Sequence, residues 1–292
     1  KEYIFARNQG TGYSDNIHQE KCMAANGMGG WSGLCPTQEL VDAYEMANGS
    51  TPIIGYNADG TPIINGASGY SETGFAATAG KHYPAGVYNM YVGREPRFYA
   101  SINFNGQQWR GRQLEFWQGG KDGINVSKVD YCCTGYLLRK TADEGVDVIN
   151  GKGGMKEASI LFRAGSLYLD YAEALNEAEG PVDDVYKYVD AIRKRAGLPG
   201  LAKGLDKDKM RERIQHERQI ELAFEAGHRY FDCHRWKIAE KTDNGYMHGM
   251  NITATNKVDY SKRSTVGDSR VFEKKHYLFP IPQSEMDKRI GL

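Results

Sequence analysis

Apolar residues recur at helical spacing in the second half of the chain. Five of them step by three, four, three and four residues and form one stripe along a helix: Val182, Val185, Val189, Ile192 and Ala196. A similar pattern precedes it, at Leu161, Leu167, Tyr168, Tyr171, Ala172 and Leu175. Gly180-Pro181 breaks the chain between the two. The pattern predicts an antiparallel helical hairpin of about the size of a tetratricopeptide repeat (TPR).

Other segments also show regular patterns. A third helix is predicted over residues 206–241, with Asp206 as its N-cap, and a short helix over residues 36–44. Strand-like runs, separated by turn signals such as Asn105-Gly106, occupy residues 2–5, 97–102, 113–117 and 135–140. Near the end of the chain an apolar stretch, residues 276–283, is held extended by two prolines.

These elements divide the chain near residue 150. Residues 1–150 are rich in loops with short strands, and residues 50–90 form a Gly-, Thr-, Asn-, Ser- and Tyr-rich stretch too long for an ordinary connection. We expect this region to bind a ligand. Residues 151–292 are predicted to be a helical scaffold, packed with the first region as one domain. The hairpin cannot bury both its faces alone, so we expect it to stack on helices upstream. The predicted fold is mainly α, a TPR-like α-α superhelix with long irregular loops and a few short β-strands.

Composition narrows the classes of function. The 292 residues include 37 Lys+Arg and 37 Asp+Glu, so the formal net charge is zero, which disfavours a nucleic-acid partner and a polybasic membrane contact. The 19 tyrosines and 35 glycines are typical of loops that carry exposed aromatic rings. No apolar run reaches the roughly 18 residues of a membrane span, and Lys1 begins no signal peptide. We expect the chain to start inside a longer protein.

The chain has an odd number of cysteines, so they cannot all pair within it: Cys22, Cys35, Cys132, Cys133 and Cys233. Cys22 and Cys35 flank a Gly-rich loop and could pair, whereas the adjacent Cys132 and Cys133 would form only a strained bridge. His228, Cys233 and His234 could be drawn as a metal cluster. The two histidines are six residues apart and share a helical face poorly, so no metal site is predicted.

Charged residues crowd the third predicted helix. Glu217, Glu221 and Glu225 step by four and share a face. Paired carboxylates are what a glycoside hydrolase uses for general acid/base chemistry. However, the same segment supplies balancing charges, and we favour a structural ion-pair network made of Glu217, Arg218, Glu221, Glu225, Arg229, Asp232 and Arg235.

Aromatic residues in the first region are the candidates for ligand contact. An aromatic ring can stack on the apolar face of a sugar, and a rigid ring loses little conformational entropy on binding. The predicted ligand-binding residues are Trp31, Tyr56, Tyr70, Tyr83, Tyr88 and Tyr91, with Asn57 and Asp59 to bond hydroxyl groups. The alternative is that some of these rings fasten the loops to the core. Trp109, Trp117 and Trp236 are expected to pack internally.

Several stretches, in order along nearly the whole chain, resemble the C-terminal half of the SusD/RagB family. They are residues 36–44 (PTQELVDAY), 94–100 (REPRFYA), 168–177 (YLDYAEALNE), 192–198 (IRKRAGL), 216–236, which opens HERQIELAFE, and 279–286 (FPIPQSEM). The family's N-terminal helical repeats and its lipidated cysteine are absent from this sequence.

The resemblance implies a non-catalytic, TPR-based lipoprotein of the Bacteroidetes outer membrane. Such a protein would face the exterior, anchored by a lipid upstream of Lys1, and would deliver glycans to a SusC-like TonB-dependent transporter. It implies no cofactor, although a structural calcium ion held by loop oxygens, such as those of Asp122, would be compatible with the family. The alternatives are RagB-like peptide uptake and, less favoured, a glycoside hydrolase.

Overall fold

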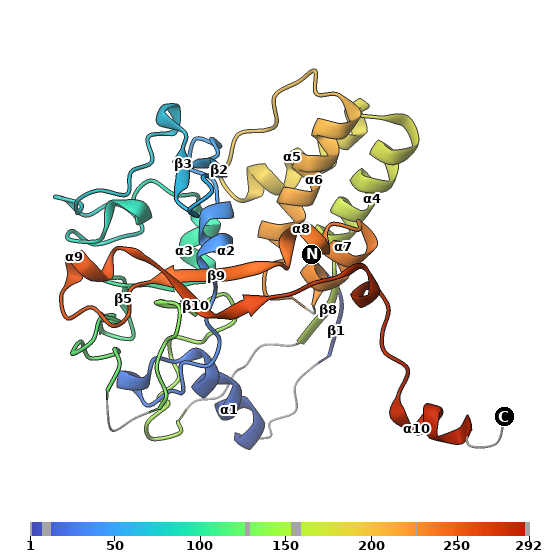
Figure 1. Ribbon diagram of the computed structural model, residues 1–292. Coiled ribbons are helices and arrows are strands. Elements are labelled where there is room, and N and C mark those ends of the chain that lie inside the picture. Colours follow the sequence, from blue (N-terminus) through green and yellow to red (C-terminus); the bar gives the residue numbers. More distant parts are fainter. Residues whose placement is uncertain (1, 8–12, 126–128, 153–158, 226, 290–292) are drawn as a thin grey trace.

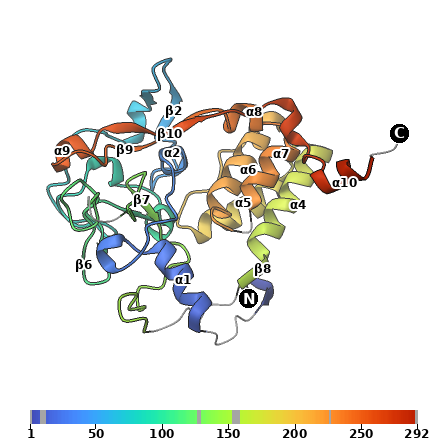
Figure 2. The same cartoon turned by 60° about the horizontal axis from the view of Figure 1, so that its bottom comes forward.

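The computed structural model describes residues 2–7, 13–125, 129–152, 159–225 and 227–289. The chain forms a loop-rich part and a bundle of helices, which lie side by side (Figures 1 and 2). Strands β9 (Gly245–Met250) and β10 (Arg263–Arg270) form a long antiparallel ribbon that runs from the bundle across the loop-rich part. The two sequence regions are therefore interleaved, because this ribbon belongs to the second region but packs on α2 (Gln38–Ala43) of the first.

Short elements separated by loops make up the first region. Its helices are α1 (Tyr13–Met23), α2 and α3 (Pro96–Ser101). Its strands are β1 (Tyr3–Arg7), β2 (Ile53–Tyr56), β3 (Pro62–Ile64), β4 (Ile102–Phe104), β5 (Gln108–Trp109), β6 (Arg112–Gln113) and β7 (Tyr136–Leu138). They pair in twos, β2 with β3, β4 with β7 and β5 with β6, while β1 pairs with β8 (Ser159–Arg163). The core between them is aromatic, with Tyr91, Phe98, Phe104 and Tyr136 packed together.

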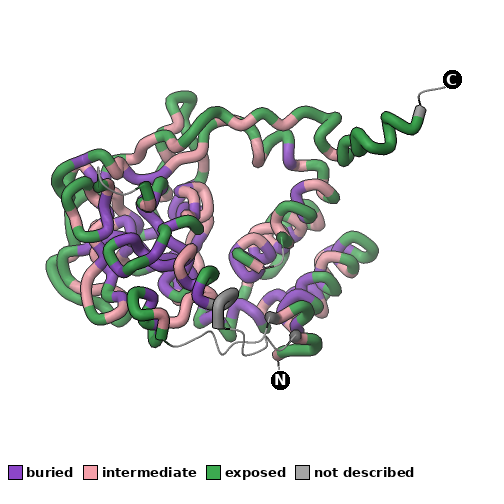
Figure 3. Tube along the Cα trace, turned by 90° about the horizontal axis from the view of Figure 1, so that it is seen from below, coloured by how far each residue is buried: buried purple, intermediate pink, exposed green. Residues whose placement is uncertain are grey.

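The helical hairpin is confirmed. It consists of α4 (Ala164–Glu179) and α5 (Asp183–Arg195), and the stripe residues Val185, Val189 and Ile192 are buried. The first helix begins later than predicted, because residues 159–163 form β8, so Leu161 belongs to a strand and is exposed. Helices predominate and the strands are short, as expected. Buried segments gather in the loop-rich core and on the inner faces of the bundle (Figure 3).

The third helix, predicted over residues 206–241, is wrong in extent. It is divided into α6 (Lys207–Glu221), α7 (His228–Arg235) and α8 (Ala239–Thr242). Phe224, Gly227 and Lys237 have φ values of 64°, 73° and 58°, which no right-handed helix can contain. The predicted N-cap is confirmed, because the Asp206 side chain accepts a bond of 2.8 Å from the backbone N–H of Lys209.

Two strand predictions also need correction. Residues 97–102 form mostly α3, because Pro96 is at its first turn. The adjacent residues Phe98 and Tyr99 are both buried, whereas a half-buried strand would turn them to opposite faces. Residues 113–117 contribute only Gln113 to a strand. The β9–β10 ribbon and the short α9 (Lys257–Tyr260) were not predicted, since their sequences lack an alternating apolar pattern.

The chain ends in an extended segment followed by the short α10 (Gln283–Met286), away from the body of the molecule (Figure 1). Its apolar residues Leu278, Phe279 and Ile281 are exposed. The extended conformation predicted for residues 276–283 is confirmed only for residues 278–282, because a 3-10 helix ends at Tyr277 and α10 begins at Gln283. The suggested pairing of Cys22 with Cys35 is not present. All five cysteines are free, and the Sγ atom of Cys35 lies 3.7 Å from that of Cys132 instead.

Candidate binding site

A pocket of about 650 Å³ opens in the loop-rich part. It is lined by residues 80–84 of the long loop, by α3 and the proline that begins it, by Gln107 and Gln108, and by Arg139 after β7. One predicted ligand-binding residue, Tyr83, lies here. The pocket therefore combines a loop aromatic with a rigid wall from the core.

Aromatic rings form one side of this pocket. The ring of Tyr83 lies 6.1 Å from that of Tyr99, at 27° between planes, and the ring of His82 lies 5.1 Å from Tyr99, at 20°. Tyr99 is 4% exposed, and its hydroxyl donates to the carbonyl of Tyr91 (2.5 Å) and accepts from the backbone N–H of Arg94 (3.1 Å). Tyr99 is therefore held rigidly in the wall of the pocket. The half-buried Tyr83 and the exposed His82 stack on it from the solvent side.

A tight turn holds Tyr83 in place. The backbone N–H of Gly80 donates to the carbonyl of Tyr83 (2.9 Å), and a Cβ atom on Gly80 would lie 2.4 Å from Cζ of the Tyr83 ring. The ring thus rests on the bare backbone of Gly80, and glycine is the residue that permits this close approach.

We expect Gly80→Ala to weaken ligand binding by moving the Tyr83 ring without removing an atom of it. The affinity should fall by about as much as in Tyr83→Ala, while the urea midpoint stays unchanged because the turn is on the surface. Isothermal titration of both variants would check this. Gly66→Ala provides the comparison within residues 50–90, since no atom lies within 4 Å of its Cβ position and its φ is not positive.

Cationic groups complete the pocket. The guanidinium of Arg139 donates to the carbonyl of Tyr99 (2.8 Å) and lies 4.8 Å from the centre of the Trp109 ring. Partial burial and the charges of Lys81 and Arg139 lower the pKa of His82 below its ordinary 6.5, so its imidazole is neutral at pH 7. The pocket offers polar groups beside a flat ring, as a ligand with both hydroxyls and an apolar face requires.

Three other predicted tyrosines surround one ion-paired arginine rather than a cavity. Arg263 of β10 binds Asp42 (2.7 and 2.9 Å) and Glu72, and these carboxylates accept bonds from the hydroxyls of Tyr56 and Tyr70 (2.7 Å each). The Tyr88 hydroxyl donates to the carbonyl of Glu72. These tyrosines fasten loops to the ribbon, although residue Tyr56 as a whole remains 48% exposed.

Two residues predicted to bind ligand, Tyr91 and Tyr70, are buried, so their assignment is wrong. Tyr91 is 1% exposed in the aromatic core and Tyr70 is 6% exposed, so neither offers a face to a ligand. Trp31 lies apart from the pocket, stacked on His18 of α1 (5.5 Å) and close to Lys21. Asn57 and Asp59 are exposed and shape the turn between β2 and β3 through bonds with Thr61. The predicted ligand-binding residues therefore do not line one common site.

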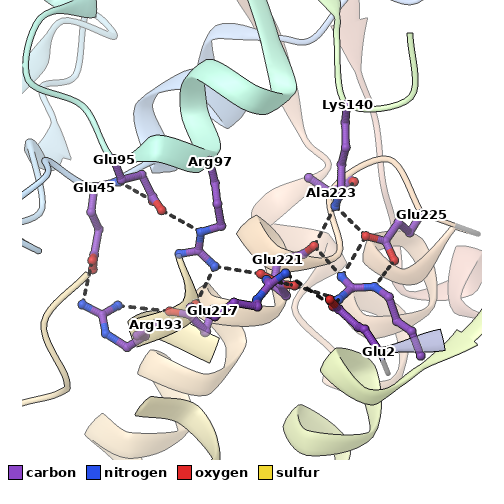
Figure 4. A network of polar contacts seen from close by, with 12 residues as sticks. Glu2, Glu45, Glu95, Arg97, Lys140, Arg193, Glu217, Glu221, Ala223 and Glu225 are labelled. Carbon is purple, nitrogen blue, oxygen red and sulfur yellow. Dashed lines mark hydrogen bonds and ion pairs between the residues drawn. The ribbon is translucent and has the colours of Figure 1, made fainter. Parts of the chain in front are cut away.

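The structural ion-pair network is larger than predicted (Figure 4). Glu217 of α6 accepts bonds from Arg97 of α3 (2.6 Å) and Arg193 of α5 (3.0 Å). Glu221 accepts from Arg97 (3.1 Å), Arg163 (2.8 Å) and Arg195. Glu225 binds Arg163 (2.7 Å) and Lys140. Because α3 carries both Arg97 and Tyr99, the network fixes the wall of the pocket to the helical bundle.

A second cluster holds α7 against α4 and α6. Arg218 bonds to Asp232 (2.9 Å) and Asp170, and Arg235 bonds to Asp232 and to Glu173, which also accepts from Nε1 of the half-buried Trp236 (2.7 Å). Within the described part of the chain, Arg229 forms no ion pair, so its assignment to the network is wrong.

These pairings do not suit general acid chemistry. Burial acts to raise the pKa of Glu221, but Arg195, Arg163 and Arg97 together hold it below its ordinary value of 4.5. The pKa of Glu225 is also lowered, because Arg163 and Lys140 outweigh its burial. A hydrolase needs one carboxyl group with a raised pKa, which neither residue provides. Both oxygens of Glu217 are bonded to arginines.

The metal candidates are also accounted for. His234 packs on the Tyr230 ring (4.0 Å), and the described residues contain no group of three His, Cys, Asp or Glu that could hold an ion. Both oxygens of Asp122 accept bonds of 2.7 Å from Arg112, so a calcium ion there would have to displace a guanidinium.

Comparison with known proteins defines the class. The SusD family model matches residues 1–292, and the chain belongs to this family. Over 82 residues it is 42% identical to one SusD-like protein of Formosa agariphila, covering 27% of this chain and 15% of that protein. A second SusD-like protein of that bacterium is 29% identical over 153 residues, 49% of this chain and 26% of its own length.

Solved structures agree with the fold. A SusD-like protein from Bacteroides fragilis matches 99% of the chain with a TM-score of 0.71 and 29% identity. A SusD-like carbohydrate-binding protein from the same species matches 98% with a TM-score of 0.73 and 23% identity. The chain spans about half the length of these two proteins, 52% and 53%. Among the helices that the structure describes, none has the length and apolar character of a membrane span.

Proposed function

We propose that this chain is part of a non-catalytic glycan-binding protein that holds an oligosaccharide in the pocket beside Tyr83. The observation that carries the proposal is the Tyr83 ring, stacked over the fixed Tyr99 and bordered by polar groups. A sugar presents an apolar C–H face to such a ring and hydroxyls to the groups around it. Membership in the SusD family supports this function, and one related structure bears the description carbohydrate-binding.

The same proposal includes delivery of the glycan to a SusC-like TonB-dependent transporter in the outer membrane. The protein would face the exterior, attached by a lipid anchor upstream of this chain. Family membership supports this placement. Isolation of a TonB-dependent barrel together with the tagged full-length protein from outer membranes would test it, with a soluble periplasmic protein as the negative control.

We expect Tyr83→Ala to weaken glycan binding by at least about tenfold, because a central aromatic contact is worth more than about 1.4 kcal/mol. A glycan array followed by titration calorimetry on the full chain would measure it. Tyr246→Ala, which removes an exposed ring from β9, should bind as the unaltered protein does.

Three results would count against this proposal. Glycan binding that survives Tyr83→Ala would exclude the pocket as the site. Release of shorter products from a bound glycan would mean that the protein is an enzyme. Binding of peptides instead of glycans would favour RagB-like peptide uptake.

A further inference from the structure

The charge of the pocket is unbalanced. Among the described residues that line it, three are basic, Lys81, His82 and Arg139, and none is acidic. The chain as a whole carries equal numbers of acidic and basic residues, so this is a local excess. Since His82 is neutral at pH 7, Lys81 and Arg139 carry the positive charge there.

Neither cation pairs with a carboxylate of the part of the chain that the structure describes. Within the described residues, no Asp or Glu lies at ion-pair distance from Lys81 or Arg139. Glu95, which precedes the lining residue Pro96, is buried and binds Arg97 (2.7 Å). Glu144 accepts from the backbone N–H of Arg110 (3.3 Å), and its charge acts on Arg139 only from beyond ion-pair distance. Arg97, Arg163 and Arg193, in contrast, each bind at least two carboxylates.

Arg139 is the more unusual of the two, because it is partly buried. Among the described residues, its guanidinium contacts a carbonyl oxygen and the face of the Trp109 ring. Burial lowers the pKa of Arg139, and the more distant charge of Glu144 offsets this only in part. A cation that has lost part of its hydration without a counter-charge is stabilised by an anionic ligand.

From this geometry we infer that the pocket selects acidic glycans, with a carboxylate or sulfate group of the sugar placed between Arg139 and Lys81 while the ring stacks on Tyr83. The inference rests on the proposed glycan-binding function and adds the class of ligand. Arg139 can form a two-pronged bond to either anion, and Lys81 adds a charge at the rim. Neutral His82 donates or accepts a hydrogen bond with a sugar hydroxyl.

The test compares matched ligands on the full chain. Oligogalacturonate is titrated beside the same oligosaccharide with its carboxyl groups reduced to alcohols, and chondroitin sulfate oligosaccharide beside its desulfated form. The acidic member of at least one pair should bind about tenfold or more tightly. Its affinity should fall as salt rises from about 50 to about 300 mM, because exposed charges are screened over about 10 Å at 0.1 M. The pair that shows the preference identifies the anionic group.

Substitutions separate this inference from the proposed function. Lys81→Gln should weaken binding of the acidic ligand about fivefold and leave the neutral one unchanged, and Lys81→Glu should weaken it further. Arg139→Gln should weaken binding of the acidic ligand more strongly than Lys81→Gln. Arg139→Lys keeps the charge and is the comparison variant if Arg139→Gln does not fold. Lys241→Glu, an exposed lysine on α8, is the matched control.

Each outcome has a defined meaning. Binding of neutral glycans that depends on Tyr83 but not on Lys81 or Arg139 would overturn the acidic-ligand inference and leave the proposed function standing. If no glycan in the panel and array binds in a Tyr83-dependent manner, both fail. Preference for the acidic members, lost in Lys81→Glu and kept in Lys241→Glu, supports both.

Discussion

Replacing Arg193 by methionine is expected to lower the free energy of unfolding by about 3 kcal/mol. Arg193 is 2% exposed and bridges Glu45 (2.9 Å) and Glu217 (3.0 Å), two carboxylates that are themselves buried. Breaking a buried ion pair leaves an uncompensated charge, which costs about 3–5 kcal/mol. We expect the lower end, because Glu45 keeps Arg213 and Glu217 keeps Arg97. Urea denaturation followed by circular dichroism would measure the change.

The pH dependence of this difference identifies its cause. Burial acts to raise the pKa of Glu45, but Arg213 and Arg193 hold it below 4.5 in the intact protein. The stabilisation from its charge is therefore fully present above about pH 4.5 and is lost as the pH falls through the lower, folded value. The difference between the intact protein and Arg193→Met should accordingly shrink only below about pH 4.5, as the pH falls through that folded value. A difference that is constant with pH would point to lost packing.

Lys187→Met on the same helix is the matched control. Lys187 pairs with Asp184 at 3.1 Å on the exposed face of α5, so its loss should not measurably change the urea midpoint. If Arg193→Met were as mild as Lys187→Met, the buried network would not stabilise the contact between the bundle and the loop-rich part.

The network also shows what the sequence could predict. Glu217, Glu221 and Glu225 step by four, and this spacing alone is enough to predict a charged face that needs cations. The cations expected from the same helix are mostly not the partners. Arg97, Arg163 and Lys140 come from segments 60 to 120 residues away, and no local pattern brings them to α6. Periodicity describes one element, whereas ion pairs between elements depend on how the whole chain folds.

The candidate site was also only partly predictable from the sequence. Tyr83 was predicted from its Gly-rich loop, and it lines the pocket. Tyr99 and Arg139 were missed, because residues 97–102 were assigned to a strand and Arg139 follows a strand with no motif. Pro96, a proline suited to the first turn of a helix, was the signal that could have placed Tyr99 on a helix. Tyr56, Tyr70, Tyr88 and Tyr91 have the same composition around them as Tyr83, so composition could not separate rings that anchor loops from rings that face a cavity.

Tyr91 provides the sharpest test of that distinction. Sequence context placed it among the ligand-binding rings, whereas the structure buries it, with its ring centre 4.4 Å from that of Phe104 and 6.1 Å from that of Phe98. We expect Tyr91→Ala to lower the free energy of unfolding by about 3–5 kcal/mol, since it leaves a cavity in a close-packed aromatic core. Tyr83→Ala, by comparison, should leave the urea midpoint almost unchanged and reduce only ligand affinity.

Tyr91→Phe keeps this prediction measurable if the alanine variant does not fold. It removes only the hydroxyl, which donates to the hydroxyl of Tyr136 over 3.2 Å, and should cost about 1 kcal/mol. The folded phenylalanine variant should bind the glycan with unchanged affinity, because Tyr91 does not line the pocket. A folded Tyr91→Phe protein with an unaltered urea midpoint but weakened glycan binding would show that Tyr91 belongs to the ligand site after all, and that the pocket beside Tyr83 extends into what the structure places in the core.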